Sequence, residues 1–310
     1  MKSILRIAVS SLLIIYLLLE IDWHVIGSAF LQINASIYIL STLIALICPV
    51  FSALKYRQLI KDTSISLSVP RLIAINYISR FYALLIPSAL GPEAVRWYKV
   101  TKNRQGRSFF LASTMLERIF FLLTLLAFGA VPLFFYSENH QIIAARHQLA
   151  PLLITAFLLL TCGLIFFIFP GAQKKLNQLI LKYFPALKQT KLDQFLKNFE
   201  VKQSMRSLAG PLLALSLLWQ FFFIARMFFL FLSLHLPLTF IDVTWMGSLV
   251  LLLQVLPISF AGIGVREGAY AYLFTLFNLP PEKGVLIGIL FFTQMLVFSA
   301  IGAVLNLFET

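Results

Sequence analysis

Eight charged side chains lie in or beside otherwise apolar stretches of this sequence, and their types favour one kind of chemistry. They are Arg80, Arg96, Arg118, Arg226, Arg266, Glu93, Glu117 and Glu267. Arginine stays charged and can hold a phosphate through two parallel hydrogen bonds, which a lysine ammonium cannot do. The surplus of two positive charges therefore favours an anionic lipid headgroup as the ligand. The alternative is that the pairs Glu117–Arg118, Glu93–Arg96 and Arg266–Glu267 compensate each other's charge within the fold.

Two of these arginines follow similar breaks in apolar sequence, "IPSALGPEAVRWY" at 86–98 and "LPISFAGIGVREGAY" at 256–270. The spacing from proline to arginine is the same in both, each stretch ends in Val-Arg, and each has a glycine in its predicted turn. The turn residues are Pro87, Gly91, Pro92, Pro257, Gly262 and Gly264. "AFGAV" at 127–131 and "AIGAV" at 300–304 follow at nearly equal distances. These matches predict an internal repeat.

The composition places these residues in a membrane. Apolar residues make up 60% of the chain and charged residues only 12%, far outside the range of soluble domains. We therefore expect a single all-α integral membrane domain over residues 1–310. Its six full transmembrane helices are predicted approximately at 4–19, 36–54, 108–135, 149–169, 210–234 and 284–308.

The positions of lysine and arginine predict the orientation. Most basic residues must lie on the same side of the membrane, and the positive-inside rule makes that side cytoplasmic. They include Lys2, Lys55, Arg71, Lys99 and the basic run that begins at Lys174. Both termini are then cytoplasmic. Residues 172–206 read as a basic amphipathic segment on the anionic inner leaflet, because apolar stripes alternate with its lysines. Nucleic acid is the disfavoured partner.

The same assignment predicts two re-entrant hairpins of opposite orientation. Residues 71–99 enter and leave from the cytoplasm, and residues 244–279 from the exterior. The halves 1–148 and 149–310 then form an inverted repeat, and transporters with such repeats bind substrate where broken helices meet. Non-helical backbone at that depth must be buried in protein or line a wet cavity.

Other side chains add little catalytic chemistry. Tyr98 and Tyr270 are further candidates for contacts with the substrate, although interfacial anchoring is the alternative for each aromatic residue. The four histidines are in or beside outer loops without metal-site spacing, and the two cysteines are in apolar spans. No phosphate-binding loop is present. We expect no metal and no cofactor.

Three blocks of the sequence resemble a known family. They are "SRFYALLIPSALGPEAVRWY", "STMLERIF" at 113–120 and "LPISFAGIGVREGAYAYLF". They are similar to the signature blocks of the lysylphosphatidylglycerol synthase transmembrane-region family, also called flippase-like integral membrane proteins. The resemblance covers essentially the whole chain. Where such proteins commonly have Gly-Gly-Asp, this chain has Gly91-Pro92-Glu93, which keeps the acid and alters the turn.

The resemblance implies movement of an anionic phospholipid or a polyprenyl-phosphate-type lipid between leaflets of the cell membrane. Bifunctional members carry a soluble synthase domain after this region, and this chain stops at Thr310, so we expect a translocator rather than an enzyme. The alternatives are a membrane glycosyltransferase and an accessory scaffold for envelope lipid synthesis, with a lipid-synthesising enzyme as a candidate partner.

The expected mechanism passes the lipid phosphate from one hairpin to the other. Arg96 and Arg266 receive it in turn, and Glu93 and Glu267 are their partners when the site is empty. Glu117 either braces the first hairpin together with Arg118 or takes up a proton.

Overall fold

The computed structural model describes residues 23–61, 66–85, 91–102, 107–135, 140–168, 204–256 and 262–308. Within these ranges the regular structure is entirely helical. In chain order the elements are α2 (Trp23–Leu31), α3 (Ala35–Ala45), α4 (Cys48–Ile60), α5 (Val69–Leu85), α6 (Gly91–Thr101), α7 (Arg107–Ala130), the short 3₁₀ helix η1 (Val131–Phe135), α8 (His140–Ile168), α11 (Ser204–Leu232), α12 (Phe240–Val255), α13 (Val265–Leu276) and α14 (Pro281–Leu307).

Four segments are long and apolar enough to cross a membrane. They are Ala35–Ile60, Thr114–Phe135, Leu208–Leu232 and Pro281–Leu307, and they match four of the six predicted spans. The predicted span at 149–169 lies within α8, where the apolar part Leu149–Leu164 is shorter. The predicted span at 4–19 and nearly all of the basic segment at 172–206 lie outside the described residues.

Short polar signals set the helix boundaries in this apolar chain. The Asn34 side chain accepts a hydrogen bond from the Ile37 backbone N–H at 3.1 Å and begins α3. Thr239 and Asp242 cap α12 reciprocally, since each side chain accepts from the backbone N–H of the other. These caps satisfy donors that a helix start leaves unpaired. Pro49 stands in the first turn of α4, directly after the break that separates it from α3.

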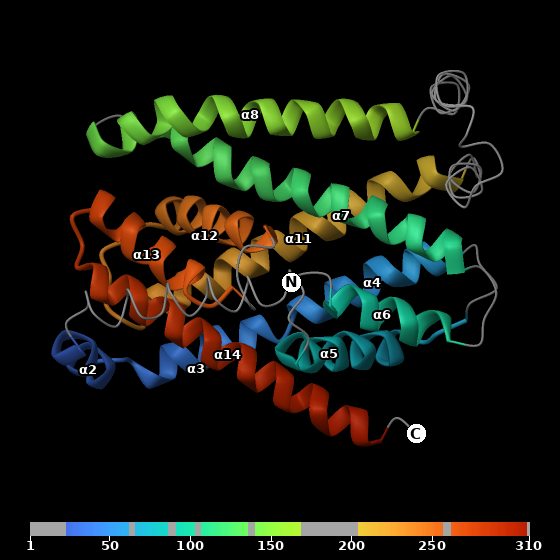
Figure 1. The fold of residues 1–310 in the computed structure, drawn as a ribbon, viewed down its shortest axis with the longest axis horizontal. Helices are drawn as coiled ribbons and strands as arrows, with labels where there is room; N and C mark the ends of the chain where they lie inside the picture. The colour runs from blue at the N-terminus through green and yellow to red at the C-terminus, as the bar shows by residue number, and fades with distance from the viewer. Residues whose placement is uncertain are drawn as a thin grey trace, which may run out of the picture.

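The two predicted hairpins correspond to two pairs of packed helices, α5 with α6 and α12 with α13. Figure 1 shows the first pair toward one end of the long axis of the molecule and the second pair toward the other end. The turn between each pair is only partly described, and Pro87 and Pro257 lie outside the described residues. Gly262 and Gly264 have φ values of 78° and 83°, which only glycine adopts without strain.

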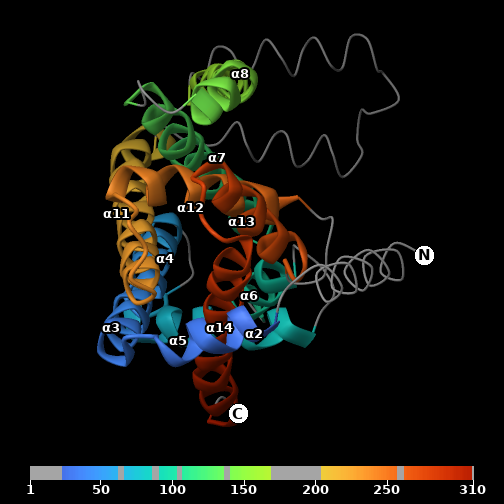
Figure 2. The same ribbon diagram turned by 90° about the vertical axis from the view of Figure 1, so that its left-hand side faces the viewer.

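Helix α14 joins the two pairs, because it packs along both α13 and α5 (Figure 2). Glycines on α14 allow this close approach. A Cβ added at Gly284 would lie 2.6 Å from the Tyr270 carbonyl oxygen, and one at Gly302 would lie 2.1 Å from the Tyr77 carbonyl oxygen. Small residues that bring helix backbones together are typical of helix packing in membranes. The charged side chains are therefore carried by helices held in close contact.

Candidate functional site

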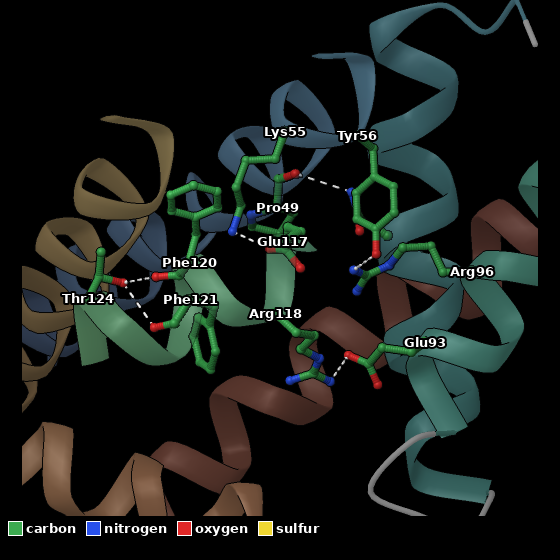
Figure 3. A network of polar contacts seen from close by, with 11 residues as sticks. Pro49, Lys55, Tyr56, Glu93, Arg96, Glu117, Arg118, Phe120, Phe121 and Thr124 are labelled. Carbon is green, nitrogen blue, oxygen red and sulfur yellow. Dashed lines mark hydrogen bonds and ion pairs between the residues drawn. The ribbon is translucent and has the colours of Figure 1, made fainter. Parts of the chain in front are cut away.

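The first part of the site is a buried ion pair between α4 and α7. The Lys55 ammonium donates to the Glu117 carboxylate (Figure 3). Their side chains are 2% and 9% exposed, and the ammonium lies 5.9 Å from the centre of the Trp219 ring. Each charge is thus compensated by the other in a site that excludes water. Breaking a buried pair is costly because it leaves one charge alone.

Arg96 lies beside this pair without a carboxylate of its own. Its Nη1 donates to the Tyr56 hydroxyl at 2.9 Å, and its guanidinium carbon lies 4.9 Å from the centre of the Tyr56 ring (Figure 3). The side chain is buried, and its Nε has no hydrogen-bond partner among the described residues. A buried guanidinium with unused donors is a candidate ligand site for an anion.

Glu93, one turn before Arg96 on α6, pairs with Arg118 on α7 instead (Figure 3). This pair is partly exposed, at 21% for the glutamate and 31% for the arginine side chain. The second oxygen of Glu93 is buried and has no hydrogen-bond partner in the part of the chain that the structure describes. The pair connects the first hairpin to the long helix that follows it.

These contacts correct two of the three local pairings predicted from the sequence. Glu117 and Arg118 do not pair, because Glu117 faces Lys55 on α4 and Arg118 faces Glu93 on α6. Glu93 and Arg96 do not pair either, because Arg96 turns toward Tyr56. Lys55, one of the lysines that predict the cytoplasmic side, is 1% exposed on α4 and packs against α7.

The third predicted pair, Arg266 with Glu267, is present at the start of α13. Arg266 Nε donates to a Glu267 oxygen at 3.0 Å, and its Nη2 donates to the same oxygen. The other oxygen of Glu267 accepts from the Gly264 backbone N–H at 2.7 Å, which caps the helix. Arg266 is fully buried. Its charge is therefore already compensated within the protein.

Arg226, on α11, is held by aromatic rings rather than by an acid. Its guanidinium carbon lies 4.3 Å from the centre of the Phe291 ring and 4.8 Å from that of Phe223. It is 5% exposed, and its Nε has no hydrogen-bond partner in the described part of the chain. Phe291 also lies 5.1 Å from the Arg266 guanidinium carbon, so one ring stands between two arginines.

Arg80, on α5, links these two regions. The charges of Arg96, Glu93 and Arg118 act on it from one side, and it acts in turn on Arg226. Its side chain is exposed, whereas Arg96 and Arg226 are buried. Arg80 is thus within electrostatic reach of both Arg96 on α6 and Arg226 on α11.

The remaining predicted residues fall in different surroundings. Tyr270 is buried against Phe231, with ring centres 5.7 Å apart, and is close enough to Arg226 and Arg266 for their charges to act on it. Tyr98 is 55% exposed on α6. Gly91 and Pro92 are the first two residues of α6, so the helix resumes at the predicted turn.

We call the group of interacting charges on these helices the charge cluster. It consists of Lys55, Arg80, Arg96, Arg118, Arg226, Arg266, Glu93, Glu117 and Glu267. The three glutamates pair with Lys55, Arg118 and Arg266. Three cations, Arg80, Arg96 and Arg226, therefore have no ion-pair partner among the described residues. The predicted surplus of two positive charges becomes three because Lys55 belongs to the cluster.

Lys55 and Tyr56 are the members of the site that sequence reasoning missed. Both lie inside the apolar segment Ala35–Ile60, where a lysine would be unexpected unless it were paired. The position of Lys55 within an apolar segment was therefore the signal from which a buried partner could have been predicted. In the described residues no group of three or more His, Cys, Asp or Glu side chains could hold a metal ion.

Comparison with known proteins gives the family of this chain. Neither the curated proteins nor the solved structures contain a match to this chain. A family model described as "Lysylphosphatidylglycerol synthase TM region" matches residues 3–302, which include every member of the charge cluster. The chain therefore belongs to the lysylphosphatidylglycerol synthase transmembrane-region family.

Proposed function

We propose that this protein moves a lipid with an anionic, phosphate-bearing headgroup between the leaflets of the cell membrane. A phospholipid and a polyprenyl-phosphate-type lipid both meet this description. The observation that carries the proposal is the surplus of Arg80, Arg96 and Arg226 in the charge cluster. Cations within a membrane are costly without a counter-charge, and a phosphate supplies one with the geometry that a guanidinium prefers.

The order of these arginines supports a path rather than a single site. Arg96 belongs to the first hairpin, Arg80 lies between the two regions, and Arg226 lies beside the second hairpin. A phosphate could pass from one guanidinium to the next while the acyl chains stay in the bilayer. In this proposal the protein is a translocator and performs no covalent step.

Two helix contacts support the inverted repeat. Helix α7 packs on α12, and α14 packs on α5. Gly129 faces Ser248 at the first contact, with 3.6 Å from its added Cβ to the serine Cβ. Gly302 faces Tyr77 at the second contact. The glycines of "AFGAV" and "AIGAV" thus occupy corresponding crossings, as a two-fold arrangement of the halves would require.

The arrangement also favours the proposed orientation. The two hairpins open toward opposite ends of the molecule, and α4 and α11 run in opposite directions (Figure 1). If the positive-inside rule holds, α5 and α6 enter from the cytoplasm and α12 and α13 from the exterior. Both termini are then cytoplasmic, and the hairpin tips meet within the bilayer.

Native mass spectrometry of the protein released from mild detergent tests the headgroup preference. We expect phosphate-bearing anionic lipids to remain bound to the wild type and to be lost from Arg96→Gln and Arg80→Gln. Lys102→Gln is the matched control, because Lys102 is an exposed cation just after α6. If all four proteins retain lipids equally and without preference for a headgroup, the proposal is contradicted and the role of an accessory scaffold is favoured.

A further inference from the structure

The two halves place a cation at corresponding positions but give it different partners. Arg266 follows Arg96 by 170 residues, and Arg226 follows Lys55 by 171. Lys55 and Arg226 each lie toward the C-terminal end of an apolar segment, Ala35–Ile60 and Leu208–Leu232 respectively. Each segment packs against the long final helix of its own half, α4 against α7 and α11 against α14. Arg226 is therefore the counterpart of Lys55.

The acid that pairs with Lys55 has no counterpart in the second half. Gly302 follows Gly129 by 173 residues, and the same step from Glu117 leads to Leu290. The next residue, Phe291, is the one that contacts the Arg226 guanidinium, at 4.3 Å. Leu290, an apolar residue, thus stands where the first half has a carboxylate, and the ring of the residue after it contacts the cation. The face of the ring attracts the guanidinium, but the ring has no oxygen that could accept a hydrogen bond from the guanidinium N–H groups.

The surroundings of Arg226 leave its charge uncompensated. Phe223 and Phe291 hold the guanidinium, and Nε has no partner among the described residues. The nearby charges are those of Arg80 and Arg266, both of the same sign. Only Arg266 carries its own acid, Glu267. A buried guanidinium beside a second free cation is suited to an anion with at least two oxygen acceptors.

We infer that Arg226 is a binding site for the phosphate group of a lipid, and that it is available because the second half has no acid at the position that corresponds to Glu117. This inference rests on the proposed function and assigns the position at which the headgroup is held in the second half. Phe223 and Phe291 keep the guanidinium in place, and Arg80 supplies the second cation. The same chemistry would accept free inorganic phosphate.

The decisive variant is Phe291→Glu, which places a carboxylate at the residue whose side chain contacts Arg226. The new carboxylate would compete for Arg226, so we expect affinity for short-chain phosphatidylglycerol in detergent to fall at least about tenfold, the effect of losing one charge-assisted hydrogen bond. Phe291→Gln is the matched reference, since it removes the same ring and adds a side chain of the same shape without the charge, so the affinity of Phe291→Glu should lie at least about tenfold below that of Phe291→Gln. Equal affinities in these two variants would overturn the inference.

Arg226→Lys provides a second test if the glutamate variant does not fold. It keeps the charge and loses the planar group, so binding should weaken about tenfold or more. An unchanged affinity would refute the site. Titration with inorganic phosphate separates the two ligand sources: binding of the lipid alone supports a headgroup site, whereas equal binding of inorganic phosphate, and its displacement of the lipid, would contradict the lipid assignment.

Transport measured in vesicles distinguishes failure of this site from failure of the proposed function. If wild-type protein moves lipid and Phe291→Glu moves it equally fast, the Arg226 site is wrong and the function stands. If wild-type protein binds phosphatidylglycerol through Arg226 but moves no lipid, the site stands and the function is wrong.

Discussion

Removing the acid of the buried pair, by Glu117→Gln, should destabilise the protein strongly. The substitution keeps the shape of the side chain. It leaves the Lys55 ammonium, in a side chain 2% exposed, with the Trp219 ring 5.9 Å away as its remaining partner among the described residues. Breaking a buried ion pair costs about 3–5 kcal/mol. The cation–π contact with Trp219 is already present in the wild type, so it does not reduce this cost. We therefore expect the free energy of unfolding to fall by about 3–5 kcal/mol.

Unfolding in mixed micelles with increasing sodium dodecyl sulfate, followed by tryptophan fluorescence, measures this change. Glu93→Gln is the control, because its pair with Arg118 is partly exposed, and it should lose less than about 1 kcal/mol. Replacing both buried partners, Lys55→Met with Glu117→Leu, should restore most of the stability, since no lone charge remains. A loss below about 1 kcal/mol for Glu117→Gln would refute the reasoning.

The same double variant separates the two roles considered for Glu117. If the pair only braces α4 against α7, lipid movement in the double variant should match that of the wild type. If Glu117 takes up a proton during transport, movement should be lost although the fold is retained.

Two further predictions concern packing and topology. Gly302→Ala should reduce the free energy of unfolding by several kcal/mol in the same micelle assay, because the added Cβ would lie 2.1 Å from the Tyr77 carbonyl oxygen. Gly210→Ala is the control: nothing lies within 4 Å of its added Cβ, so it should be neutral or stabilise by up to about 1 kcal/mol. Single cysteines at Ser68 and Lys102, both exposed, should react with an impermeant reagent from the same side of the membrane once the native cysteines are removed. Reaction from opposite sides would show that α5 and α6 do not form a hairpin that returns to its starting face.

Much of the fold follows from the sequence because the relevant signals are local. Apolar length predicts four of the long spans, and proline with glycine marks the breaks between α5 and α6 and between α12 and α13. The pair Arg266–Glu267 was also predictable, since the two residues are adjacent and Glu267 caps the helix that begins at Val265. Each of these features depends on residues a few positions apart.

The cross-helix partners could not be predicted in the same way. Glu117 pairs with Lys55 and Arg118 with Glu93 because of how α7 is rotated between α4 and α6. The spacing of these residues in the sequence does not determine how α7 is rotated. Lys55 was assigned to the cytoplasm because a lysine near the end of an apolar segment reads as an inside signal. The contact of Arg226 with Phe291 could not be predicted either, because the chain has 31 phenylalanines and the sequence does not show which of them contacts Arg226.

The central claim is that this protein carries a phosphate-bearing lipid across a bilayer. Purified protein in vesicles with a fluorescent phosphatidylglycerol, bleached from outside by dithionite, measures this directly. We predict that the inner-leaflet label becomes accessible faster than in protein-free vesicles, and that Arg96→Gln and Arg226→Gln, but not Lys102→Gln, reduce the rate at least about tenfold, as loss of a charge-assisted hydrogen bond would. A wild-type rate equal to that of protein-free vesicles would contradict the claim.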